Sequence, residues 1–432
     1  MNIRFYNARI LVPEDGHDFQ IVEGELWVKG NEILYIGDGN DVAGVCKEDE
    51  ILIWDREMDV RGNLLMPGFK DAHTHSAMTF LRSFADDLPL QKWLNELVFP
   101  REAQLTPEDV YPLNILGIME YLTSGITSNF DMYFFPEVNA KASVDCGFRS
   151  VLTSAMNNFQ SSVEEMEKDY YYVNELSELT SYIPGFHAEY TTSKERMTEL
   201  ARLSQKLKAP VWTHNSETEL EVSECKARWG KTPTQIMDEI GMYEYGGGGY
   251  HCVWFEEEDF DIFQRHQMSA VTNPASNLKL ASGIAPVKTF VDKGINVAIG
   301  TDGPASNNCL DMFREMFLVS GLAKVREKDA ECVSAEEILY MATAGGAKAM
   351  GLWDCDCLAA GKKADLILID LNQPNMQPEN NLVKNLVYSG SKQNVKMTMV
   401  NGEILYEDQK FSIGVEPQDI YRQANAIIRR MK

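Results

Sequence analysis

Five of the seven histidines in the chain come at or near the ends of short apolar runs, where a strand is expected to finish. These five are His73, His75, His187, His214 and His251. Imidazole nitrogens bind divalent metals and carry protons near neutral pH. His73 and His75 are two residues apart, so the period of a strand turns both side chains to the same face. Their spacing indicates that both rings reach one metal ion.

Other strand ends supply partners for this pair. His214 ends one apolar run, and Asp302 is the terminal and only acid of another. Taken alone, His73 and His75 have the alternative interpretation of two ordinary polar loop residues. Taken alone, His214 or His251 has the alternative interpretation of a buried structural histidine. Together, His73, His75, His214 and Asp302 predict a nitrogen and oxygen shell for one divalent metal, with a position left for water. Zinc is the first expectation, and iron or manganese fits the same donors.

A metal in this shell indicates hydrolysis. Such an ion lowers the pKa of bound water toward neutrality, to roughly 7, so hydroxide becomes available as a nucleophile. Asp302 is placed to take the proton of that water. Glu217 follows His214 by three residues and is placed to protonate a leaving group or a ring nitrogen. A carboxylate at the start of a helix is the other interpretation of Glu217.

The spacing of strands and helices predicts a fold that gathers these residues. Eight candidate strands, at 66–73, 125–134, 149–156, 182–190, 209–215, 249–255, 269–274 and 295–302, alternate with helical stretches such as 106–122 and 191–208. Eight such units favour a (β/α)8 TIM barrel, an α/β fold in which the carboxyl ends of all strands face one mouth. The glycine run 246–249 is expected to be a flexible turn, because no phosphate-loop lysine follows it.

Both ends of the chain carry the alternating pattern of strands. Residues 1–66 and 362–432 are therefore expected to form one smaller, discontinuous β-sandwich domain with a terminal helix, beside a barrel at 67–361. The net charge of −25 argues against nucleic acid and anionic membranes as partners. The opening stretch lacks a secretory signal, which predicts a cytoplasmic protein, and the eight scattered cysteines are expected to be reduced.

Six segments resemble the amidohydrolase superfamily, in particular the adenosine-type deaminases acting on S-adenosylhomocysteine and 5′-methylthioadenosine. They are 66–94, 185–193, 213–222, 250–255, 273–287 and 300–308, in the order and approximate spacing of that family. The resemblance implies one metal, usually zinc, held by His73, His75, His214 and Asp302. It also implies a homo-oligomer, either a dimer or a tetramer.

The resemblance assigns roles around a small nucleoside substrate. It implies that Glu217 carries a proton to the purine ring and that His251 polarises the attacking water or contacts the substrate. Trp93 would line the pocket, Glu102 and His187 would hold the ribose hydroxyls, and Ser306 would lie nearby. Hydrolysis would release ammonia and give an inosine derivative. Deamination or hydrolysis of another heterocycle, of guanine, pterin or triazine type, is the alternative, followed by a non-catalytic assembly protein with this fold.

Two residues depart from the family's pattern. Glu189 stands where a proline is usual, which predicts an added acid near the ribose. Ser154 stands where homocysteine-binding relatives carry an arginine for the amino-acid carboxylate. Without that arginine we expect 5′-methylthioadenosine, 5′-deoxyadenosine or adenosine to be preferred over S-adenosylhomocysteine.

Overall fold

The computed structural model describes residues 1–14, 16–40, 52–84 and 86–431. Cys46 lies outside these ranges. The seven cysteines within them are free thiols, as predicted. None of the helices in these ranges combines the length and the hydropathy needed to span a membrane.

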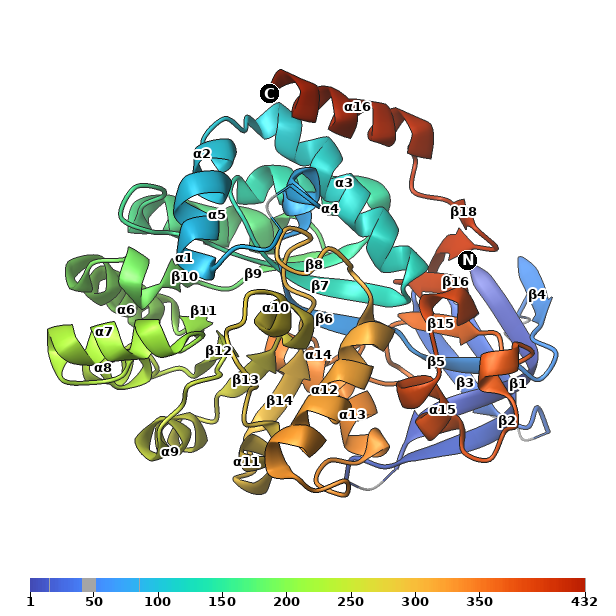
Figure 1. The fold of residues 1–432 in the computed structure, drawn as a ribbon. Helices are drawn as coiled ribbons and strands as arrows, with labels where there is room; N and C mark the ends of the chain where they lie inside the picture. The colour runs from blue at the N-terminus through green and yellow to red at the C-terminus, as the bar shows by residue number, and fades with distance from the viewer. Residues whose placement is uncertain (15, 41–51, 85, 432) are drawn as a thin grey trace.

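Parallel strands form the centre of the molecule and helices surround them (Figure 1). One sheet contains β6 (Phe69–Thr74), β7 (Ile126–Met132), β8 (Arg149–Thr153) and β9 (Thr180–Tyr182), and the other contains β10 (Gly185–Ala188), β11 (Val211–Asn215), β12 (Gly247–His251), β13 (Ser269–Thr272) and β14 (Asn296–Ile299). At one seam the backbone N–H of Asp302, beyond β14, donates to the carbonyl of His73 at 2.9 Å. This confirms the predicted (β/α)8 barrel.

The fourth predicted strand is divided at a proline. Residues 182–190 were expected to form one strand, but β9 ends before Pro184 and β10 begins after it. Proline has no N–H for the ladder, so it interrupts the pairing. Hydrogen bonds from Ile183 N to Leu152 O and from Trp212 N to Pro184 O join this connection to the strands on either side, at 2.9 and 3.2 Å.

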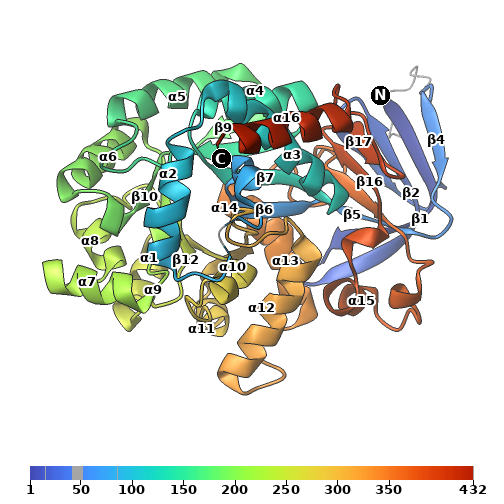
Figure 2. The same ribbon diagram turned by 45° about the horizontal axis from the view of Figure 1, so that its top comes forward.

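Helices follow most of the barrel strands and cover them on the outside (Figures 1 and 2). They are α3 (Pro107–Thr123), α4 (Pro136–Cys146), α5 (Val163–Leu176), α6 (Lys194–Leu207), α7 (Glu219–Trp229), α8 (Pro233–Glu239), α9 (Glu257–Arg265), α10 (Pro274–Lys279), α11 (Val287–Asp292), α12 (Met312–Glu327), α13 (Ala335–Ala342) and α14 (Ala344–Met350). The helices expected at 106–122 and 191–208 are α3 and α6. Ser193 caps α6 by accepting from the N–H of Arg196.

The prediction of a flexible turn at 246–249 is wrong for most of the run. Gly247, Gly248 and Gly249 belong to β12, and only Gly246 precedes it. A Cβ on Gly248 would lie 2.3 Å from the ring of Trp212, so a side chain does not fit there. The glycines allow β12 to pass close to a large aromatic residue of β11.

Strands from both chain ends form a single nine-stranded sheet beside the barrel, which confirms that both termini contribute to one additional β-structure (Figure 1). Its strands are β1 (Asn2–Pro13), β2 (Phe19–Lys29), β3 (Glu32–Gly37), β4 (Arg56–Asp59), β5 (Leu64–Pro67), β15 (Leu366–Ile369), β16 (Val395–Val400), β17 (Glu403–Glu407) and β18 (Lys410–Phe411). The two chain ends meet where β5 pairs with β15 in antiparallel register. Two helices accompany the C-terminal strands, α15 (Leu382–Tyr388) and α16 (Pro417–Arg430), and α16 packs along α3 (Figure 2).

A buried ion pair joins this sheet to the barrel. Asp365, just before β15, accepts from Nε and Nη2 of Arg149 in β8 at 2.7 and 3.1 Å, and Lys70 Nζ lies 3.7 Å away. Burial alone would raise the pKa of Asp365, but the two cations hold it below its usual value. The backbone N–H of Asn401 gives the carboxylate a further hydrogen bond at 2.7 Å.

We predict that Asp365→Asn destabilises the fold by about 3 kcal/mol, because it leaves a buried guanidinium without its countercharge. Urea denaturation followed by circular dichroism measures the change. Glu407→Gln is the matched control, since Glu407 pairs with Arg56 at a solvent-exposed site and such pairs contribute less than about 1 kcal/mol. Equal losses in the two variants would contradict the role of Asp365.

Candidate functional site

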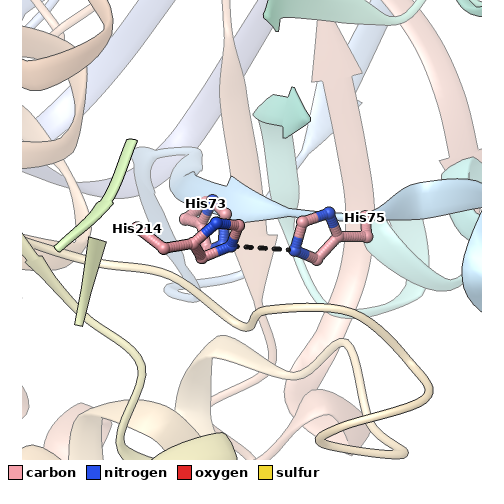
Figure 3. A group of neighbouring side chains, drawn as sticks. All are labelled: His73, His75 and His214. Carbon is pink, nitrogen blue, oxygen red and sulfur yellow. Dashed lines mark hydrogen bonds between the residues drawn. The ribbon is translucent and has the colours of Figure 1, made fainter. Parts of the chain in front are cut away.

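The predicted metal ligands come together at the carboxyl ends of three strands. His73 and His75 lie at and just beyond the end of β6, His214 lies in β11, and Asp302 follows β14. The Nε2 atoms of His75 and His214 are 3.4 Å apart, and the three rings surround one point (Figure 3). Asp302 Oδ1 is 3.2 Å from Nε2 of His75 and 3.7 Å from Nε2 of His73.

Backbone carbonyls orient two of the rings. Nδ1 of His75 donates to the carbonyl of Met132 at 2.6 Å, and Nδ1 of His214 donates to the carbonyl of His187 at the same distance. Donation by Nδ1 places the proton there and leaves the Nε2 lone pair free. This is the usual arrangement of a metal-binding histidine, in which the second nitrogen fixes the tautomer.

His73 has the clearest need for an external partner. The ring is fully buried, it stacks on Tyr250 with centroids 3.7 Å apart, and neither nitrogen has a hydrogen-bond partner among the described residues. Burial and the neighbouring His75 lower its pKa well below the usual value, so the ring is neutral. A buried polar atom without a partner is unfavourable, and a metal ion satisfies it.

Asp302 supplies negative charge to the cluster. Its Oδ2 accepts from Ser276 Oγ at 2.5 Å and its Oδ1 from the N–H of Gly303 at 2.7 Å. Burial would raise its pKa, but His75 and the other histidines hold it well below the usual value. Three imidazole nitrogens and one carboxylate form a donor set that suits a divalent metal. The residues present therefore fit the ion that the sequence predicts.

Glu217 and His251 lie close to Asp302. His251 Nε2 is 3.9 Å from Glu217 Oε2 and 4.0 Å from Asp302 Oδ2, and its Nδ1 is 2.7 Å from Asn277 Oδ1. Glu217 is buried and accepts from Ser282 Oγ at 3.1 Å. Burial raises the pKa of Glu217, which favours the protonated carboxyl that a proton donor requires.

All of the predicted site residues except His73 line one cavity. Trp93, Glu102, His187 and Ser306 are on its wall with the groups described above. Short helical turns provide part of this wall, namely η1 (Ser76–Leu81), α1 (Leu90–Lys92), η2 (Trp93–Val98) and α2 (Phe99–Glu102). His73 lies behind the wall, between β6 and Tyr250.

The rest of the cavity wall carries polar atoms without partners among the described residues. Trp93 Nε1 and Glu102 Oε1 are buried and unpartnered. Burial raises the pKa of Glu102 to about 7, against the effect of Tyr133, and burial lowers the pKa of His187 to about 3. These groups can donate to or accept from a polar ligand held in the cavity.

Sequence reasoning did not identify the residues that support the site. Ser276, Asn277 and Ser282 each hydrogen-bond one of the acidic or histidine side chains described above, and Glu221 lies behind Glu217. Ser276, Asn277 and Ser282 fall within the segment 273–287 that carries part of the family resemblance, but nothing in their spacing distinguishes them from helix and loop residues.

Ser154 lies off the cavity wall: its Oγ accepts from the N–H of Met156, and the neighbouring residues Ala155 and Asn157 are on the wall. One expectation from the sequence is corrected. Glu189 also lies off the cavity. It is buried against α7, where it pairs with Arg228 and accepts from Trp229 Nε1 at 2.9 Å. It adds no acid beside the ligand space.

We predict that His73→Ala abolishes stoichiometric binding of a divalent metal. Elemental analysis of the purified protein measures the metal content, and His266→Ala is the control because His266 pairs with Asp238 outside the site. Adding metal at a hundredfold excess over Kd to the metal-free chain should stabilise it by about 2.7 kcal/mol. Equal metal content in both variants would contradict the assignment.

The comparisons with known proteins agree with this geometry. The model of the amidohydrolase family matches residues 64–405. A 5-methylthioadenosine/S-adenosylhomocysteine deaminase of Caldanaerobacter subterraneus subsp. tengcongensis is 38% identical over 99% of both chains, and one of Pyrococcus furiosus is 38% identical over 92% of this chain and 94% of its own. A zinc-bound adenosine deaminase of Xanthomonas campestris superposes with a TM-score of 0.92 at 29% identity, covering 100% of this chain and 98% of its own. The chain belongs to the amidohydrolase family.

Proposed function

We propose that this chain is a metal-dependent aminohydrolase that deaminates adenosine-type nucleosides to inosine derivatives and ammonia. The observation that carries the proposal is one cavity that joins a metal-ligand set, a buried acid and unpartnered polar groups on the rest of its wall. The names of the relatives support it, as does the zinc-bound adenosine deaminase with the same fold.

Zinc is the metal that we propose for His73, His75, His214 and Asp302. The neighbour from Xanthomonas campestris holds zinc, and the donors here are three nitrogens and one oxygen. When bound, the metal lowers the pKa of water and so supplies a nucleophile near neutral pH.

The acidic groups of the cavity divide the proton transfers between them. Asp302, whose pKa is depressed, accepts the proton of the attacking water. Glu217, whose pKa is raised, donates a proton to the purine ring nitrogen so that the ring carbon accepts the nucleophile. His251 is fixed by Asn277 and points its Nε2 between these two carboxyl groups, where it contacts the water or the substrate. The exocyclic amine takes the proton held by Asp302 and leaves as ammonia, and the hydroxyl proton of the addition product returns to Glu217 as the carbonyl forms.

The rest of the cavity wall supplies the sugar contacts in this proposal. Glu102 and His187 hold the ribose hydroxyls, Trp93 packs against the nucleoside, and Ser306 lies near the metal ligands. Nδ1 of His187 is 2.9 Å from Thr191 Oγ1, so the other ring nitrogen is available to the ligand. Buried groups that bind a hydroxyl discriminate strongly against substrates that lack it, because they are then left unpaired.

A second cavity adjoins the first, and in this proposal it receives the 5′ substituent of the nucleoside. The two share Leu94, Phe99, Glu102, Asn157 and Tyr190. Five amide side chains are on the lining of the second cavity, namely Gln91, Asn95, Asn157, Asn158 and Gln160, beside apolar residues, and its described lining contains no lysine or arginine. A carboxylate placed there has no countercharge and lies near Glu102. This supports 5′-methylthioadenosine, 5′-deoxyadenosine and adenosine as substrates over S-adenosylhomocysteine.

We predict that Glu217→Gln keeps the metal but lowers kcat by roughly 100-fold, because the amide has no acidic proton to transfer. Elemental analysis and ammonia release measure the two quantities. Glu219→Gln, an exposed position two residues away in the first turn of α7, is the matched control and should retain full activity. A fully active Glu217→Gln would remove Glu217 from the mechanism.

We predict that kcat/KM for 5′-methylthioadenosine exceeds that for S-adenosylhomocysteine by about tenfold or more, because the carboxylate loses hydration without gaining a cation. The carboxamide of S-adenosylhomocysteine is the matched probe and should recover most of the difference. A panel that also contains adenosine, 5′-deoxyadenosine and guanine tests the wider proposal. Activity on guanine alone would overturn the ribose contacts, and a metal-loaded chain inert on every compound would favour a non-catalytic role.

A further inference from the structure

The short connection between β11 and α7 carries Glu217 in an unusual backbone conformation. Ser216 has a φ of 52°, in the left-handed region. A residue with a Cβ occupies this region at a cost of roughly 1 kcal/mol or more, so surrounding contacts must hold it there. His214 precedes this turn and Glu217 follows it directly, so the turn sets where the Glu217 carboxyl points.

Glu221 holds this turn through its carboxylate. Its Oε1 accepts from the backbone N–H of Ser216 at 3.0 Å and its Oε2 from that of Glu217 at 2.7 Å. The side chain is 2% exposed, and burial together with the charge of Glu217 raises its pKa to about 8. A buried acid so close to another acid is electrostatically unfavourable, so its position calls for an explanation beyond stability.

Ordinary capping of α7 does not explain this arrangement. Thr218 is the N-cap of the helix, and its hydroxyl accepts from the N–H of Glu221 at 3.1 Å. The two N–H groups that Glu221 satisfies belong to Ser216 and Glu217, which lie before the N-cap and outside the helix. The carboxylate therefore acts on the loop that carries Glu217 rather than on the helix terminus.

The segments that follow β12 and β13 also hold this turn. The carbonyl of Ser216 accepts from the N–H groups of Val253 and Trp254 at 3.1 and 2.9 Å. The indole N–H of Trp254 donates to the carbonyl of Ser282 at 2.7 Å, and Ser282 Oγ donates to Glu217. Glu221 is the one member of this network that contacts the backbone of both Ser216 and Glu217.

We propose that Glu221 is a positioning residue for the deamination: it holds Ser216 in the left-handed turn and thereby aims the Glu217 carboxyl at the substrate. The inference rests on the proposed function of Glu217. A displacement of a catalytic group by about 1 Å can lower the rate by roughly 100-fold. Removal of the Glu221 carboxylate is therefore expected to lower kcat without removing a group that touches substrate or metal.

The test uses the metal-loaded full chain with the substitutions Glu221→Ala and Glu221→Gln. Each variant is assayed for metal content, thermal midpoint, and kcat and KM on the best nucleoside of the panel, and each crystal structure is determined. Asp259→Asn is the control for loss of a buried helix-terminal carboxylate. Asp259 is fully buried in α9 and accepts from the N–H of Glu256 and from Thr232, away from the cavity.

We expect Glu221→Ala to lower kcat by roughly 100-fold with KM changed less than about threefold and the metal retained. Glu221→Gln keeps one acceptor oxygen and should recover about tenfold of this loss. Asp259→Asn should lower the thermal midpoint with kcat unchanged. Loss of metal in Glu221→Ala, an unchanged kcat, or an equal fall of kcat in Asp259→Asn would overturn the proposal.

The crystal structures keep this inference separate from the proposed function. In Glu221→Ala we expect Ser216 to leave the left-handed region and the Glu217 carboxyl to move from Ser282. If the wild-type chain deaminates no nucleoside, the proposed function fails, and the structures still decide whether Glu221 positions Glu217. An unchanged turn in Glu221→Ala would overturn the positioning role whatever the activity.

Discussion

The site depends on buried nitrogen and oxygen lone pairs that outnumber the hydrogen-bond donors available to them. His73 is buried, and neither of its ring nitrogens has a hydrogen-bond partner among the described residues. The Nδ1–H groups of His75 and His214 donate to backbone carbonyls. Each ring therefore presents a lone pair to the same point, beside the Asp302 carboxylate. Burial of such a set without a cation is unfavourable, so the fold as a whole is organised to hold one.

The need to place these side chains around one point accounts for the backbone conformation at the strand ends. His251 and Asp302 have φ values of 71° and 57°, and Ser216 next to Glu217 has a similar value. Strain at the ends of β11, β12 and β14 is stable only because hydrogen bonds and packing hold each one. The barrel supplies that support: the N–H of Asp302 is bound to β6, and Glu221 and the β12 loop hold Ser216. The same hydrogen bonds thus fix the positions of these side chains and maintain the strained backbone.

The sequence indicated the barrel and the cluster of histidine and acidic side chains at its strand ends better than the residues that support this cluster. A buried strand that ends in His or Asp has a clear pattern, so the barrel and the metal ligands were predicted. The supports Ser276, Asn277 and Glu221 act through tertiary contacts that leave no periodicity. The glycine run was misjudged because the bulk of Trp212, on a neighbouring strand, decided its structure.

The pairing of β5 with β15 has a consequence for how the chain is made. During synthesis the N-terminal strands leave the ribosome about three hundred residues before their partners, at roughly 5–20 residues per second. The apolar edge of β5 stays open for that time, while the barrel between the two strands forms. The last strands then close the sheet, so a truncation before β15 leaves an unpaired strand edge of the kind that promotes aggregation. The C-terminal segment thus completes the sheet that the first residues begin.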